Sequence, residues 1–133
     1  MSDVFLDTVG LIAVWDNADQ WHDPADAAYR RLLSEGRRLV TTETVLLECG
    51  NAAARRPYRQ RVHALRQSLI QEGLLLVPEP AEIEEAWACY DRGEADGAGI
   101  VDQISFRVMR RLGVTEALTN DQHFRAAGFV PLF

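Results

Sequence analysis

The chain has 133 residues, of which 47% are hydrophobic and 26% are charged, and its formal net charge is −6. This length predicts one domain spanning residues 1–133, and this composition excludes a disordered chain. No apolar run approaches the roughly 20 residues of a membrane span, and no secretory signal is visible, so we expect a cytoplasmic protein with no membrane partner. The negative charge excludes nucleic-acid binding through bulk positive charge, but metal ions can still hold phosphates locally.

Cysteine and arginine usage adds two expectations. Cys49 and Cys89 lie in apolar helical stretches, so we expect two buried free thiols and no disulfide. No cluster of His and Cys has the spacing of a zinc site. Every basic side chain apart from histidine is arginine, which suits bidentate phosphate contacts, although a codon bias explains the same composition.

The first half of the chain predicts strands alternating with helices. Residues 4–6 predict a buried strand that runs directly into Asp7 and Thr8, where a short helix or turn to Trp15 begins. A polar loop follows, and then Asp23 and Pro24 form a typical helix start, as N-cap and first helical residue. The next elements are a helix to about Ser34, a strand at 38–42, a helix starting after Thr42 or Thr44 and interrupted by Pro57, and a helix over about 58–71.

The second half continues the alternation. The fully apolar run 74–77 predicts a third strand in the centre of the sheet. A helix opens at Pro80, residues 91–99 read as a loop, and residues 100–112 form a helix with an apolar stripe. The remaining predicted elements are a strand at 117–118, a short helix at 121–126 and an edge strand at 129–130. This order predicts an α/β fold with a mainly parallel sheet.

Four acidic residues occupy positions that favour a shared site. Asp7 and Asp121 each follow a predicted strand, and ligands of parallel sheets bind outside the carboxyl ends of the strands. Glu48 lies in the apolar helical stretch 45–49, where a solvated position is hard to find, and Asp102 lies near the start of a helix. We expect these four carboxylates to converge on a divalent cation.

Each acid also has a simpler interpretation. Asp7 and Asp121 suit the N-cap position of the helices that follow them. Glu48 suits a solvent-facing position, and Asp102 suits the positive end of a helix dipole. Four such acids together favour a site, because buried carboxylates repel one another unless a cation neutralises them.

Oxygen ligands without His or Cys select Mg²⁺ or Mn²⁺. Thr8 and Thr119 are placed to hydrogen-bond the carboxylates or waters on the metal. His123 closely follows Asp121, but we interpret it as a surface or capping histidine.

Several segments together resemble a known family. In chain order they are Val4–Thr8, Thr41–Glu48, Ile100–Phe106, Gly113–Phe124 and Ala127–Phe129. They resemble a PIN domain of the VapC-like branch, the toxin ribonucleases of toxin–antitoxin systems, over essentially the whole chain. The resemblance implies a three-layer α/β/α sandwich and the cleavage of single-stranded or structured RNA by water activated by Mg²⁺ or Mn²⁺. It further implies a small antitoxin partner and a homodimer, and it assigns metal binding and catalysis to Asp7, Glu48, Asp102 and Asp121.

One segment departs from the family pattern. Relatives often carry an acid and a Trp-Ser pair or similar before the third acid, whereas this chain has a glycine-rich segment at 94–99. Either Glu94 or Asp96 supplies an extra acid to the site, or neither does.

A basic run is the candidate RNA-binding surface. It comprises Arg55, Arg56, Arg59, Arg61 and Arg66, with Tyr58 interleaved. Arg55, Arg56 and Arg59 are the residues that we expect to contact the RNA backbone. The alternative is a solvated helix face that pairs with the acids between Glu79 and Asp96.

Two other functions compete with the nuclease. The first is a PIN-like module that binds RNA or protein and has lost catalysis, against which the four intact acids argue. The second is a metal-dependent phosphatase on another α/β fold, but Asp7 lacks the Asp-x-Asp pattern of aspartyl-phosphate enzymes.

Overall fold

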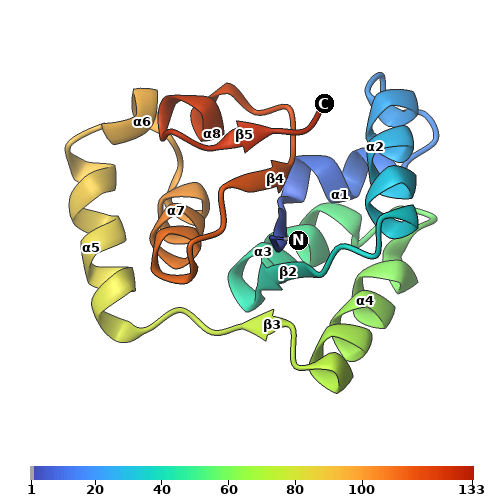
Figure 1. Cartoon of the computed structure of the whole chain (residues 1–133), viewed down its shortest axis with the longest axis horizontal. Helices are drawn as coiled ribbons and strands as arrows, with labels where there is room; N and C mark the ends of the chain where they lie inside the picture. The colour runs from blue at the N-terminus through green and yellow to red at the C-terminus, as the bar shows by residue number, and fades with distance from the viewer. Residues whose placement is uncertain (1) are drawn as a thin grey trace.

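A five-stranded parallel sheet forms the centre of the protein (Figure 1), in a computed structural model that describes residues 2–133. The strands follow the spatial order β3-β2-β1-β4-β5, and every pair is parallel. Their bounds are β1 (Val4–Leu6), β2 (Leu39–Thr42), β3 (Leu75–Leu76), β4 (Glu116–Leu118) and β5 (Val130–Pro131). The predicted α/β fold with a parallel sheet is confirmed.

Eight helices of the described chain flank this sheet. Their bounds are α1 (Thr8–Trp15), α2 (His22–Ser34), α3 (Glu43–Ala53), α4 (Arg59–Glu72), α5 (Pro80–Asp91), α6 (Glu94–Gly97), α7 (Ile100–Leu112) and α8 (Gln122–Ala126). Helix α5 packs along α7 on one side of the molecule, and α2 and α4 lie on the other side (Figure 1). Within residues 2–133, no helix combines the length and the apolar character needed to cross a membrane.

Local chemistry explains where several helices begin and end. The side chain of Thr42 accepts a hydrogen bond from the backbone N–H of Val45 (3.1 Å), so Thr42, not Thr44, caps α3. Gly113 adopts a left-handed conformation (φ 69°) that ends α7. Helix α2 begins at His22, so the predicted start at Asp23 and Pro24 is wrong by two residues and Asp23 lies in the first turn.

The prediction that residues 74–77 form a central strand is wrong. Strand β3 is at the edge of the sheet and pairs only with β2. Leu75 and Leu76 are half-buried, and the side chain of Val77 is 71% exposed. The central strand is β1, whose residues are all buried between β2 and β4. An apolar run therefore predicted a strand correctly but not its neighbours.

Three aromatic rings hold α7 and α8 together. Phe106 of α7 contacts Phe124 of α8 edge to face, with ring centroids 4.9 Å apart, and stacks on Phe129 at 5.5 Å. All three rings are buried. This cluster fixes the start of α8 beside α7. The two cysteines are buried and free, as expected.

Candidate metal centre

Asp7 lies at the end of the central strand and is 1% exposed. It occupies the N-cap position of α1, but its side chain makes no capping hydrogen bond. Instead its Oδ2 accepts a hydrogen bond of 2.8 Å from Thr119 Oγ1. Its Oδ1 is buried with no hydrogen-bond partner in the described chain. The capping interpretation of Asp7 therefore does not explain its side chain.

Thr119 joins the ends of the two neighbouring strands. Its Oγ1 donates to Asp7 and also accepts a hydrogen bond from the backbone N–H of Asp121 (3.0 Å). Asp121 in turn caps α8, because its Oδ1 accepts from the backbone N–H of His123 (2.9 Å). The capping interpretation of Asp121 is thus confirmed. Because Oδ1 makes the capping bond, Oδ2 of Asp121 is available to bind a ligand in the cavity.

The four predicted acids line one cavity of about 260 Å³. They come from four separate parts of the fold, and the rest of the lining is Thr8, Val9, Gly99, Ile100 and Val101. Asp102 is half-buried, and Glu48 is exposed. The alternative that Glu48 faces solvent is confirmed, and Glu48 nevertheless lines the cavity.

Sequence reasoning missed His123, a side chain that lies beside two of these acids although it does not line the cavity. Asp102, Asp121 and His123 each offer a potential ligand atom, and these three atoms all lie within 4.8 Å of one another. The Nδ1 atom of His123 is 2.7 Å from Asp121 Oδ1. The only signal in the sequence was the spacing of two residues between Asp121 and His123, which is equally typical of a capping turn.

Burial and mutual repulsion both raise the pKa values of acids in this cavity. Burial, with Asp102 second, raises the pKa of Asp7 from 3.8 to about 8. Burial, followed by the charges of Asp121 and Glu48, raises the pKa of Asp102 to about 7. The folded chain thus disfavours the ionised form of both groups, and a bound cation would reverse this preference.

The residues present fit a divalent cation. The donor set consists of carboxylate oxygens and one imidazole, and the buried Oδ1 of Asp7 lacks any partner that would compensate for its desolvation. Carboxylate oxygens are the ligands of Mg²⁺ and Mn²⁺. Among the described residues that line the cavity there is no arginine. The negative charge of the carboxylates therefore has no positive side chain in the lining to balance it, which favours a bound cation.

Thr8 lines the cavity, as expected, and its buried Oγ1 has no hydrogen-bond partner within residues 2–133. The other two acids considered from the sequence, Glu94 and Asp96, do not line the cavity. Asp96 is exposed, has a positive φ of 59° and is not part of the cavity lining. Glu94 pairs with Arg92 at 2.6 Å.

The basic run does not reach the cavity lining. Arg56 pairs with Asp16 at 2.9 Å, and Arg55 and Arg59 are exposed. The alternative that this run pairs with the acids between Glu79 and Asp96 is wrong. Those acids pair with arginines outside the run, namely Arg92, Arg107 and Arg111.

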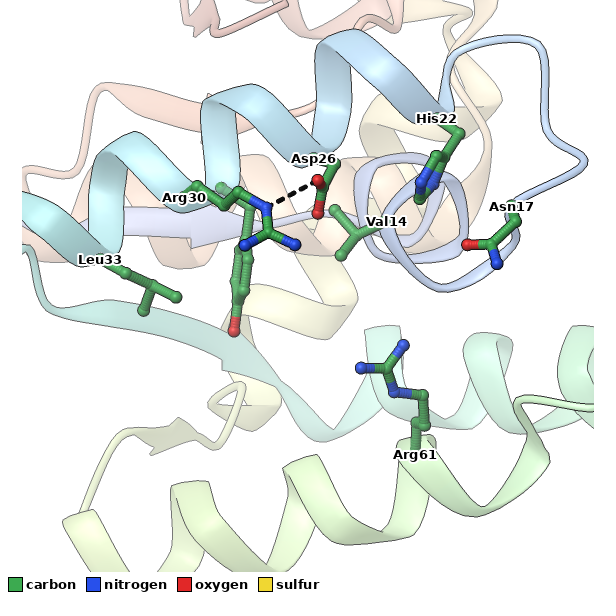
Figure 2. Close-up of a pocket in the computed structure, with 8 residues that line it drawn as sticks. Val14, Asn17, His22, Asp26, Arg30, Leu33 and Arg61 are labelled. Carbon is green, nitrogen blue, oxygen red and sulfur yellow. Dashed lines mark hydrogen bonds and ion pairs between the residues drawn. The ribbon is translucent and has the colours of Figure 1, made fainter.

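A second cavity, of about 270 Å³, lies between α2 and α4 (Figure 2). Asp26 is the one carboxylate in its lining, and Arg30 already neutralises it through a contact of 2.8 Å. Arg61 of α4 faces this pair across the cavity in Figure 2. This cavity lacks the cluster of unneutralised oxygens that a divalent cation needs.

A parallel sheet with carboxylates gathered beyond its strand ends defines an α/β protein with an acidic cluster that suggests a metal site. The sequence profile of the PIN domain matches residues 4–130. The chain therefore belongs to the PIN domain family.

Solved structures support this assignment. The crystal structure of Mycobacterium tuberculosis VapC20, described as a sarcin–ricin loop cleaving toxin, is similar with a TM-score of 0.76. It is 28% identical, over 96% of this chain and 97% of that chain. FitAcB from Neisseria gonorrhoeae has a TM-score of 0.64 at 15% identity, covering 98% of this chain and 96% of that chain. DNA-bound VapBC from Salmonella typhimurium has a TM-score of 0.63 at 17% identity, covering 98% of this chain and 96% of that chain. The last two share the fold. A comparison with curated protein sequences found no match.

Proposed function

We propose that the protein is a metal-dependent endoribonuclease that acts as the toxin of a toxin–antitoxin pair. The observation that carries this proposal is the cavity that Asp7, Glu48, Asp102 and Asp121 line together. Membership of the PIN family and the 28% identity to VapC20 over nearly the whole of both chains support the same function.

The chain's own residues have distinct roles in this proposal. The four carboxylates hold one or two divalent cations, Mg²⁺ or Mn²⁺. A bound cation supplies Lewis-acid chemistry, activating water and stabilising the charge that develops on the scissile phosphate. Thr119 orients Asp7 by donating to its Oδ2, and the buried Thr8 is placed to bond with water in the cavity.

Attraction of the substrate depends on the cation. The chain carries a net charge of −6, and no basic side chain lines the cavity. A phosphate therefore approaches this centre only when positive charge is bound there. Arg55, Arg56 and Arg59 are proposed to hold the RNA backbone outside the cavity.

The proposed substrate is structured or single-stranded RNA. Since VapC20 is described as cleaving the sarcin–ricin loop, an RNA that contains this loop is the first substrate to test. We further propose a small antitoxin protein and a homodimer as the partners of the chain, and a cytoplasmic location.

The test is a cleavage assay on the loop RNA and on a mixed RNA pool, with Mg²⁺, with Mn²⁺ and with a chelator. We expect internal cleavage only with a cation, and none by Asp7→Asn at wild-type helix content. Asp23→Asn, which removes an exposed carboxylate that is not part of the cavity lining, should cleave like the wild type. RNA or antitoxin binding without cleavage under any cation would favour the inactive PIN-like module instead.

A further inference from the structure

We propose that a ring nitrogen of His123 is a ligand of the cation in this centre, which makes the site selective for Mn²⁺ and Co²⁺ over Mg²⁺. The inference deepens the proposed function and rests on its metal centre. It differs from the purely carboxylate site that the sequence predicts.

The positions of the three candidate ligands carry the proposal. His123, Asp121 and Asp102 offer atoms that all lie within 4.8 Å of one another. The Nδ1 atom of His123 is 2.7 Å from Asp121 Oδ1. In the absence of an ion this contact is a hydrogen bond, and it holds the imidazole ring beside the carboxylate that would share the ion with it.

The core holds His123 in this position. Its neighbour Phe124 is buried and packs edge to face on Phe106 at 4.9 Å. Phe106 lies one helical turn after Asp102 on α7, so the contact between the two rings sets the spacing between His123 and Asp102. The side chain of His123 is 37% exposed, so a cation can reach the ring from solvent.

An independent feature of the same centre indicates that a ligand is missing. Asp7 lines the cavity, is 1% exposed, and its Oδ1 has no hydrogen-bond partner in the described chain. An unpartnered carboxylate oxygen at this depth costs free energy unless a cation or a donor binds it.

Nitrogen coordination predicts the selectivity. Mg²⁺ prefers oxygen ligands and keeps several waters. A nitrogen ligand binds the first-row ions Mn²⁺ and Co²⁺ more tightly than it binds Mg²⁺, and it binds Co²⁺ more tightly than Mn²⁺. Removing the imidazole should therefore weaken Mn²⁺ and Co²⁺ binding by about tenfold or more and leave Mg²⁺ binding nearly unchanged.

The chain provides a matched control. Its other two histidines, His22 and His63, do not belong to the cluster that His123 forms with Asp102 and Asp121. His22 Nδ1 lies 2.8 Å from the carbonyl oxygen of Ala13, whereas His63 is exposed on α4. His63→Gln therefore removes an imidazole without touching the metal centre.

Pulsed EPR of the Mn²⁺-loaded chain tests the ligand directly, since it detects coupling between Mn²⁺ and a coordinating ¹⁴N nucleus. We expect this coupling in the wild type and in His63→Gln, and its loss in His123→Gln. Calorimetric titration with Mg²⁺, Mn²⁺ and Co²⁺ measures the selectivity on the same three proteins.

Four outcomes would overturn the inference. Bound Mn²⁺ without ¹⁴N coupling in the wild type removes His123 from the ligands and leaves the proposed nuclease standing. Persistence of the coupling in His123→Gln, or an equal loss of Mg²⁺ and Mn²⁺ affinity, does the same. If the wild type binds none of the three cations, the proposed function fails as well.

Discussion

Substitution of Gly10 by alanine tests how closely α1 must approach β4 for the centre to form. A Cβ atom at this position would lie 1.9 Å from the carbonyl oxygen of Leu118 and 2.7 Å from its carbonyl carbon. The obstructing atoms belong to the backbone of β4, so no side-chain rotation relieves the clash. Either α1 or β4 must move.

The expected loss of stability follows from two opposing effects. Forcing a methyl group against packed backbone costs about 3 kcal/mol or more, because this contact is far inside van der Waals distance. The higher helix propensity of alanine compared with glycine stabilises the folded state by up to about 1 kcal/mol. We therefore expect Gly10→Ala to lower the free energy of unfolding by about 2 kcal/mol or more, a large part of a typical domain's stability.

Gly50→Ala provides the control, because Gly50 lies within α3 and a Cβ there meets no atom within 4 Å. This variant should gain up to about 1 kcal/mol. Urea unfolding followed by circular dichroism measures both variants. A Gly10→Ala protein as stable as the wild type would refute the reasoning about this close approach.

Three further predictions concern the centre and its surroundings. Folding raises the pKa of Asp7 from 3.8 to about 8, so between these pH values the folded state holds a proton that the unfolded state releases. In the absence of cations the free energy of unfolding therefore falls as the pH rises from about 4 to about 8, by at most about 1.4 kcal/mol per pH unit. Asp7→Asn should reduce this slope in urea unfolding with chelator at about pH 5.5 and pH 7.5; an unchanged slope would contradict the assigned pKa. Thr119→Val should lower the free energy of unfolding by about 1–3 kcal/mol and weaken Mn²⁺ binding. Thr115→Val, at an exposed position, should change the free energy of unfolding by less than about 0.5 kcal/mol. Equal losses of stability in the two variants would contradict the role of Thr119 in joining Asp7 to Asp121. Arg55→Gln with Arg59→Gln should weaken RNA binding and flatten its salt dependence by about one logarithmic unit per lost phosphate contact, and unchanged filter binding would place the RNA elsewhere.

The sequence predicted the location of the centre because the rule that supports it is local. Asp7 and Asp121 each follow a strand, and parallel strands place their carboxyl ends on one edge of the sheet. The structure places both residues in one cavity with Glu48 and Asp102. Helix starts with a hydroxyl cap, such as Thr42 before α3, were predictable for the same reason.

The errors concern features that depend on distant parts of the chain. Whether residues 74–77 lie in the centre or at the edge of the sheet depends on which strands flank them, and an apolar run does not encode its neighbours. His123 lies beside Asp102 and Asp121 because Phe106 and Phe124 hold α8 against α7, and no local pattern around residue 123 contains that contact.

We propose that carboxylates distant in sequence meet in one cavity to hold a divalent cation. Anomalous diffraction from crystals soaked in Mn²⁺ tests it most directly, because the ion itself is then located. We predict a peak in the cavity, within bonding distance of Asp102 and Asp121 and beside Asp7. A well-occupied peak only at another surface, or none at a Mn²⁺ concentration well above that of the protein, would contradict the claim.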